Sequence, residues 1–338
     1  MTRYIIRRLL QMIPVLIMVA LFTFIMMRAI PGGPFDFRGD RSLPPQVTAN
    51  LEAKYHLDWP LWKQFVSYLI GDGVFGVEDG TRGLIMGDLG PSLRYRGQSV
   101  NDIVAGTLPV SIQLGLMSVF VAVIIGVPTG IIAALRQNTV VDYVSTFASV
   151  MFLSIPNLVL APLLIWVFAL RLDIFPVAFW GAKPPFFLGF LPDPSQLNAD
   201  FFMHAVLPVF ALGTASAASF SRLTRASLLQ VIEEDYIRTA RAKGLREMAV
   251  IGIHALKNSL IPVVTVLGPL FAVLVTGTFI VEQIFGINGL GKHFIQSIGN
   301  RDYQVITGVT FIFALFLVVA NLLVDIAYAW LDPRIRYD

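Results

Sequence analysis

The fold is decided by a charged stretch that reads Glu233-Glu234-Asp235-Tyr236-Ile237-Arg238-Thr239-Ala240-Arg241-Ala242-Lys243-Gly244-Leu245. Apolar runs long enough to cross a bilayer flank it on both sides. A charged side chain inside lipid is costly, so this helix-favouring segment cannot lie within the membrane. It must lie at the water boundary, on the side where basic residues collect, and there it can contact a soluble partner.

Composition points to a membrane protein. The chain has 338 residues, of which 56% are hydrophobic and 14% charged. Soluble domains carry about 25% charged residues, so we expect an integral membrane protein in contact with lipid. The net charge of +3 is spread over loops rather than concentrated on one face, which argues against nucleic acid as a partner. Because the chain has no cysteine, disulfides and thiolate metal sites are excluded.

Long apolar runs predict an all-α protein with six transmembrane helices. A bilayer core of about 30 Å needs roughly 20 apolar residues per helix. The candidate spans are Leu9–Ile30, Thr107–Leu135, Tyr143–Leu170, Met203–Ser221, Leu260–Val281 and Tyr303–Trp330. The second and third exceed one span, so we expect them to tilt or to project beyond the lipid.

The N-terminus resembles a signal peptide, because Arg3, Arg7 and Arg8 precede an apolar stretch. That stretch continues to Ile30, longer than the roughly 7–15 residues of a signal core, and it ends without a small-x-small cleavage site. We therefore interpret residues 1–30 as an N-terminal segment and a retained first span. A cleaved signal peptide is the alternative.

Basic residues near the span ends predict the orientation in the membrane. They gather at the N-terminus, at Arg136, after the fourth span and at the C-terminus with Arg334 and Arg336. Six spans place these four regions on one face, so both termini and residues 233–246 are predicted to be cytoplasmic. Residues 31–106 then form an extracytoplasmic region, and residues 107–338 form a five-helix core.

Local signals predict helices in the extracytoplasmic region. One is expected near Gln46–Tyr55, and a second after Asp58 as N-cap, with Pro60 in its first turn. Ser99 and Asp102 have the spacing of a loose capping box before the second span. Arg28, near the outer end of the first span, can extend its charged group to the interface.

Small residues in two spans predict close helix contacts. Gly126 and Gly130 form a small-xxx-small pattern, and residues 213–219 are rich in Gly, Ala and Ser. Such faces let helix backbones approach closely in lipid. Ordinary packing of the bundle explains them, and a solute pathway lined by these residues is the alternative.

No motif predicts catalysis, cofactor binding or metal binding in this chain. Residues 286–293 nearly spell a phosphate-binding loop, but His293 stands where Ser or Thr must hold Mg²⁺. The four histidines lack the spacing of a zinc site. The charged stretch itself has two readings: a docking helix, or a solvated helix whose charge order only suits the helix dipole.

Several separated motifs resemble one family. Residues 235–245, followed by 254–263, closely resemble the cytoplasmic loop of ABC importer permeases of the dipeptide, oligopeptide and nickel class. Residues 1–15, 87–92, 281–291 and 301–303 are similar to the same class, in its first-permease type. Departures are Gly33, Asn288 and the sequence Arg238-Thr239-Ala240, and residues 73–84 look like extra length in the external region.

The resemblance implies a type I ABC importer permease fold with a short cytoplasmic coupling helix that docks on an ATPase. By motif position its residues are Glu234, Asp235, Tyr236, Arg238, Thr239, Ala240, Arg241, Ala242, Lys243 and Gly244. It identifies no residue of the substrate path. The implied localisation is a bacterial or archaeal cell membrane.

The resemblance also implies an assembly. Its partners are a second homologous permease, two cytoplasmic ATPases that bind ATP and Mg, and an extracytoplasmic solute-binding protein. The expected function is peptide import, without enzyme activity in this chain. Import of nickel chelates or other small solutes is the alternative. A stand-alone proton-coupled carrier is a different class that stays open at this point.

Overall fold

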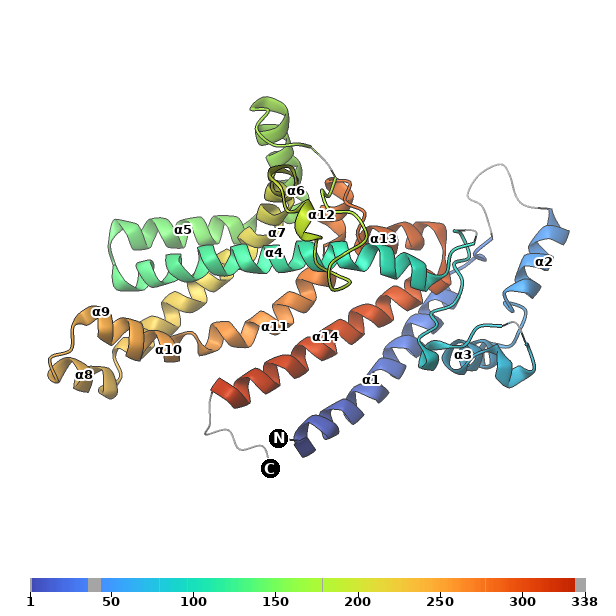
Figure 1. Cartoon of the computed structure of the whole chain (residues 1–338), viewed down its shortest axis with the longest axis horizontal. Helices are drawn as coiled ribbons and strands as arrows, with labels where there is room; N and C mark the ends of the chain where they lie inside the picture. The colour runs from blue at the N-terminus through green and yellow to red at the C-terminus, as the bar shows by residue number, and fades with distance from the viewer. Residues whose placement is uncertain are drawn as a thin grey trace. The chain divides into compact units, whose positions relative to one another are not determined.

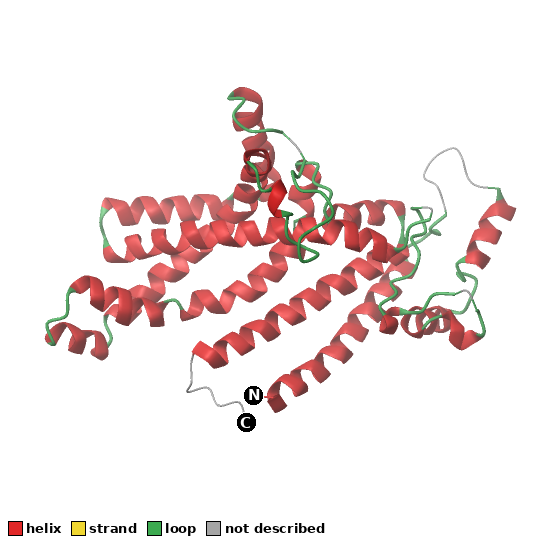
Figure 2. Cartoon of the chain, in the orientation of Figure 1, coloured by secondary structure: helices red, strands yellow, loops and turns green. Residues whose placement is uncertain are grey.

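The structure is a computed structural model that describes residues 2–35, 44–78, 80–95, 97–177, 179–276 and 278–331. Within these ranges the chain consists of helices joined by loops, and its only β pairings are two isolated bridges (Figure 2). The all-α prediction is confirmed. The basic residues Arg334 and Arg336, from which a cytoplasmic C-terminus is predicted, lie outside the described ranges.

Five helices of the described chain are long and apolar enough to cross a membrane. They are Tyr4–Ala29, Val100–Leu135, Ala199–Ile232, Ile261–Ile284 and Tyr303–Ile326. A sixth span is present if the consecutive helices Val140–Ser154 and Asn157–Arg171, which meet at an angle of 102°, count as one. The structure therefore has five to six candidate spans, in agreement with the sequence.

The candidate span Tyr143–Leu170 is broken into two helices. Helix α5 (Val140–Ser154) ends before Ile155, and α6 (Asn157–Leu164) begins after Pro156 and continues as a π-helical turn to Arg171. Ile155 has φ −84° and ψ 114°, the extended conformation into which a following proline drives a residue. Pro156 also lacks the N–H that a continuous helix would use.

The chain divides into two compact units. Unit 1 comprises Met1–Leu108 and Gly289–Val318, and unit 2 comprises Pro109–Asn288 and Val319–Asp338. Helices α4 (Val100–Leu135) and α14 (Tyr303–Leu331), which are labelled in Figure 1, each contribute residues to both units.

Unit 1 contains the first candidate span and the region predicted to be extracytoplasmic. The first span is α1 (Thr2–Ala29), and unit 1 also holds α2 (Pro45–Lys54), α3 (Leu61–Ile70) and α13 (Leu290–Asn300). Its largest apolar core includes Ala20, Tyr68, Val100, Leu290, Val305 and Val309, which come from α1, α3, α4, α13 and α14. The predicted helix near Gln46–Tyr55 is confirmed as α2.

Helix starts in unit 1 test two capping predictions. Asp58 as N-cap is wrong, because α3 begins at Leu61 with Pro60 at the cap and no side chain bonded there. The capping box before α4 is confirmed. The Asp102 carboxylate accepts from the Ser99 N–H at 2.9 Å, and the Ser99 hydroxyl oxygen accepts from the Asp102 N–H at 3.1 Å.

A buried carboxylate joins distant parts of unit 1. Asp302, at the start of α14, accepts from the Ser92 hydroxyl at 2.5 Å and from the N–H groups of Leu93 and Arg94 at 3.2 and 3.3 Å. Its side chain is fully buried, so these donors replace the water it loses. The loop at residues 92–94 is thereby fixed against α14.

Unit 2 contains α7 (Ala199–Ile232), which packs closely against α4. A Cβ atom on Gly126 would lie 2.8 Å from the Cβ of Phe220, and one on Gly130 would lie 2.7 Å from the Cβ of Thr224. Both distances are shorter than carbon atoms tolerate, so only glycine fits. The predicted use of Gly126 and Gly130 for close helix packing is confirmed.

Candidate functional site

The charged stretch folds into α8 (Asp235–Ala242), directly after α7 (Figure 1). Glu234 takes the N-cap position in an extended conformation, with φ −67° and ψ 148°. At the other end the Gly244 N–H donates to the Arg241 carbonyl at 2.9 Å, and Gly244 has φ +77°. Gly244 follows directly after the end of α8, where glycine adopts this left-handed conformation at little cost.

Helix α8 has one buried and one exposed face. Ile237 is 0% exposed and Ala240 is 6% exposed. They pack in one apolar cluster with Ala134 of α4, Leu228 of α7, and Val250 and Ala255. The other nine residues of the predicted site are exposed: Glu234, Asp235, Tyr236, Arg238, Thr239, Arg241, Ala242, Lys243 and Gly244.

Most residues of the predicted site therefore face solvent, whereas Ala240 is buried against other residues of the same chain. Sequence reasoning missed Ile237 as the main anchor of α8. Its signal was present: Ile237 and Ala240 lie three positions apart, on one face of a helix, and the residues between and around them are polar or charged.

Two polar contacts fix α8 to the segment that follows it. The Asn258 amide, on α10 (Leu256–Ser259), donates to the Tyr236 hydroxyl at 2.8 Å. Arg241 forms a two-bond ion pair with Glu247 on α9 (Glu247–Ala249), at 2.7 and 3.2 Å. Hydrogen bonding from Arg241 lowers the pKa of the Glu247 carboxyl. The pair closes the turn that contains Gly244.

An ion pair with a buried carboxylate holds the C-terminal part of α7 against α5. Asp142, near the start of α5, accepts from the Nε and Nη2 of Arg225 at 2.6 and 2.7 Å, and from the Asn138 N–H at 3.0 Å. Its side chain is 3% exposed. Arg225 precedes the end of α7 at Ile232 by about two helical turns. Sequence reasoning missed this pair, because its members are 83 residues apart.

The near phosphate-binding loop lies between α12 (Phe279–Ile284) and α13, whose N-cap is Gly289. A phosphate-binding loop needs a strand before it, and the described residues that precede this one are helical. No group of three or more His, Asp or Glu in the described ranges is arranged to hold a metal ion.

Comparison with known proteins assigns the family. The model of the binding-protein-dependent transport system inner membrane component matches residues 126–337. The model of the N-terminal part of the membrane component of such systems matches residues 1–115. The chain belongs to this family. It is a multi-pass protein of the bacterial inner-membrane type, and its resemblance to ABC importer permeases is confirmed.

Relatives of this permease align over almost their whole length. It is 42% identical over 336 residues to the dipeptide transport system permease protein DppB of Bacillus subtilis, covering 99% of this chain and 98% of the relative. It is 41% identical over 337 residues to the oligopeptide transport system permease protein OppB of Escherichia coli K12, covering both chains in full.

A solved structure supports the permease fold. The MetNI methionine ABC transporter, in an inward-facing conformation, superposes with a TM-score of 0.52 at 15% sequence identity. The match covers 67% of this chain and 94% of the other. Family membership implies association with an ATPase and a substrate-binding partner, and it assigns ATP hydrolysis to separate subunits.

Proposed function

We propose that this chain is the membrane permease of an ATP-driven peptide importer and that α8 is its contact with a cytoplasmic ATPase. Peptide as cargo is supported by relatives of about 40% identity that are named as dipeptide and oligopeptide transport permeases. The proposed assembly has a second homologous permease, two ATPases that bind ATP and Mg, and an extracytoplasmic solute-binding protein. Both chain termini lie in the cytoplasm.

The observation that carries this proposal is the division of α8 into two faces. On one face, Ile237 and Ala240 are buried in the apolar cluster, and this packing holds α8 against the rest of the chain. The outer face is exposed, and Arg238, Thr239 and Arg241 make it polar. A solvated helix without a partner does not need to be held at several points. Helix α8 is held by this packing and also by the bonds of Tyr236 to Asn258 and of Arg241 to Glu247.

These attachments define a route for force. When two ATPases close on ATP, a pull on α8 reaches the end of α7 through Leu228 and α4 through Ala134. The Asp142–Arg225 pair extends the same connection from α7 to α5. A helix attached at several points moves these segments together, which is what switching solute access from outside to inside requires.

Cysteine crosslinking tests the contact, since the chain has no cysteine of its own. Ala242→Cys places a thiol on the exposed face of α8, and Ala240→Cys places the same thiol on the buried face. With a short bifunctional crosslinker, the assembled complex should give an adduct between the ATPase and the Ala242→Cys permease, and none with Ala240→Cys.

Ala240→Cys is the control. Its thiol lies on the same helix only two positions from Ala242, but on the buried face, so a difference in adducts reports which face of α8 contacts the ATPase. If the Ala242→Cys permease forms no adduct in an intact, ATP-hydrolysing complex, the proposed ATPase contact is wrong. Equal amounts of adduct from both variants would also contradict it, because Ala240 would then be as accessible to the ATPase as Ala242.

A further inference from the structure

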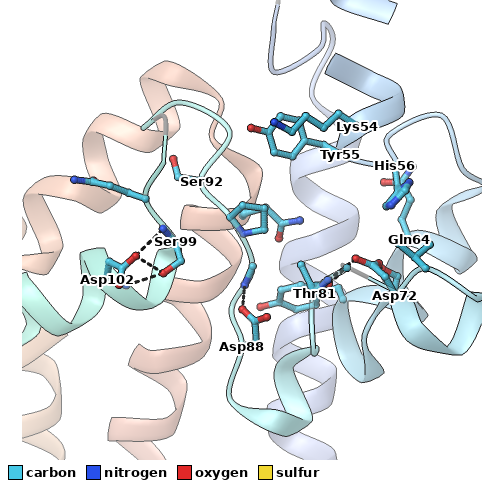
Figure 3. Close-up of a pocket in the computed structure, with 18 of the residues that line it drawn as sticks. Lys54, Tyr55, His56, Gln64, Asp72, Thr81, Asp88, Ser92, Ser99 and Asp102 are labelled. Carbon is cyan, nitrogen blue, oxygen red and sulfur yellow. Dashed lines mark hydrogen bonds between the residues drawn. The ribbon is translucent and has the colours of Figure 1, made fainter. Parts of the chain in front are cut away.

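Unit 1 contains a pocket of about 800 Å³ (Figure 3). Its walls come from the ends of α1 and α2, the segment between α2 and α3, and α3 itself. The loops within residues 72–78, 80–92 and 97–99 and the starts of α4 and α14 complete them. Small-molecule sites in proteins have volumes of about 300–1,000 Å³, so a short peptide-sized ligand fits the space.

Arg28 lines this pocket and is held rigidly. Its Nε donates to the Gln64 side-chain oxygen at 2.8 Å, and its guanidinium carbon lies 3.5 Å from the centre of the Phe24 ring. The orientation of Gln64 is set in turn, because its amide nitrogen donates to the carbonyls of Leu57 and Trp59 at 3.0 and 2.7 Å. The amide oxygen must therefore face Arg28.

The remaining donors of Arg28 have no acceptor among the described residues. Its two terminal nitrogens form no hydrogen bond there, and no carboxylate pairs with it. Tyr68, also in the pocket wall, is 6% exposed, and its hydroxyl likewise has no partner in the described chain. A desolvated polar group without a partner is unfavourable, and the buried Tyr68 hydroxyl is such a group. Beside the unbonded terminal nitrogens of the half-buried Arg28, it indicates a missing acceptor.

Arg28 and Tyr68 lie close enough to interact electrostatically. A tyrosine hydroxyl is protonated at neutral pH and can donate, and burial raises the pKa of Tyr68 further. A planar guanidinium donates two parallel hydrogen bonds to a carboxylate, and a tyrosine hydroxyl can add a third. The acceptor that these two side chains fit best is a carboxylate.

The acidic residues of the pocket wall do not supply this acceptor. Asp72 accepts from the Thr81 N–H at 2.7 Å, Asp88 from the Gly90 N–H at 2.9 Å, and Asp102 from the Ser99 hydroxyl at 2.6 Å (Figure 3). Together with Arg28 and Lys54, the wall carries two cations and three carboxylates. A lining of both signs suits a ligand with both charges better than a simple anion such as phosphate.

We propose that this pocket binds a short peptide with free termini, and that the Arg28 guanidinium and the Tyr68 hydroxyl donate hydrogen bonds to its terminal carboxylate. The inference rests on the proposed peptide function and adds to it a site on the permease itself. The amino terminus of the peptide then faces the carboxylate-bearing part of the wall.

Calorimetric titration of the purified permease–ATPase complex in lipid nanodiscs, without its solute-binding protein, tests the site. The probes are tri-alanine and tri-alanine amide, which differ only in the terminal carboxylate. Tri-alanine should bind at least about tenfold more tightly, because charge-assisted hydrogen bonds to Arg28 are lost with the amide. This comparison needs no variant and so does not depend on how a variant folds.

Variants then assign the donors. Arg28→Gln should abolish the difference between the two peptides, and Tyr68→Phe, which removes one oxygen atom, should reduce it. Arg171→Gln is the matched control, because Arg171 is an exposed arginine in unit 2 and should leave the difference unchanged. Equal binding of the two peptides by the unaltered complex, or no binding of either, would overturn the inference.

Uptake separates this result from the proposed function. Vesicles that contain the complete transporter and its solute-binding protein are assayed for ATP-driven import of tri-alanine. Import together with equal binding of acid and amide would refute the pocket and leave peptide transport intact. Absence of import for tri-alanine and other short peptides would instead refute the proposed function.

Discussion

Gly244 sets the end of α8 through its backbone. Its φ of +77° is strained for a residue with a side chain, by roughly 1–2 kcal/mol, and more for a β-branched one. Gly244→Val should therefore shift the turn after α8 and uncouple the transporter, so that ATP is hydrolysed with little uptake. Parallel assays of ATPase activity and solute uptake in reconstituted vesicles measure this.

Gly252→Val is the matched control for Gly244. Gly252 lies in the π-helical turn Val250–Ala255 without a positive φ, and a Cβ atom at either glycine would meet nothing within 4 Å. The two variants thus differ in backbone strain rather than in steric contact. Unchanged coupling in Gly244→Val, or equal loss in both variants, would contradict the role given to Gly244.

The Asp142–Arg225 pair should contribute measurably to stability. Asp142→Asn removes a charge-assisted acceptor from a buried site, which costs about 1.5–3 kcal/mol. The melting temperature of the purified complex should fall. Asp235→Asn is the control, because Asp235 pairs with Arg238 at 3.2 Å on an exposed surface and such pairs contribute little. A fall of the same size in both variants would show that burial of the pair is irrelevant.

Sequence distance explains which residue contacts could be predicted. The Ser99–Asp102 box and the end of α8 at Gly244 depend on neighbours within a few positions, so local spacing indicates them. Arg28 and Gln64 are 36 residues apart, and Asp142 and Arg225 are 83 apart. Nothing in either local pattern identifies the partner, because the fold alone brings the two side chains together.

The contact between α4 and α7 depends on glycine. Gly126→Val would force a side chain into the space occupied by Phe220 and the Ala217 backbone. Overpacking of this kind costs about 1–3 kcal/mol, so thermal stability of the complex should fall. Gly106→Val, in the same helix, is the control, because a Cβ atom there would meet nothing within 4 Å. If both variants melt alike, the two helices are not packed as closely as described.

The break between α5 and α6 shows why element ends were harder to predict than element types. Hydropathy alone joined the two helices, although Ile155-Pro156 carries a break signal. Proline by itself does not decide, because Pro109 and Pro128 lie inside α4 and Pro208 lies inside α7. Whether a proline ends a helix depends on how neighbouring helices satisfy the freed backbone groups, which the local sequence does not state.

Composition predicted the class of the protein because the bilayer imposes a strong constraint. Backbone groups in lipid must be satisfied within the segment, so long apolar runs become helices. Composition does not predict how the chain divides into compact units, because unit 1 combines the N-terminal part with the distant residues 289–318. Asp302 and Ser92, which fix that junction, are 210 residues apart, and chain order gives no sign of their contact.

The central claim is that α8 lies at the cytoplasmic face, within reach of an ATPase. Single-cysteine variants test it, because the chain has no native cysteine. Ala242→Cys reports on α8, and Lys183→Cys reports on the exposed loop between the α6 segment and α7. Each is treated with a membrane-impermeant maleimide, in intact spheroplasts and after permeabilisation.

The measurement is the extent of maleimide labelling before and after permeabilisation. Lys183→Cys should be labelled in both conditions, and Ala242→Cys only after the membrane is opened. Labelling of Ala242→Cys in intact spheroplasts would place α8 outside the cell, beyond reach of any cytoplasmic ATPase, and would contradict the account.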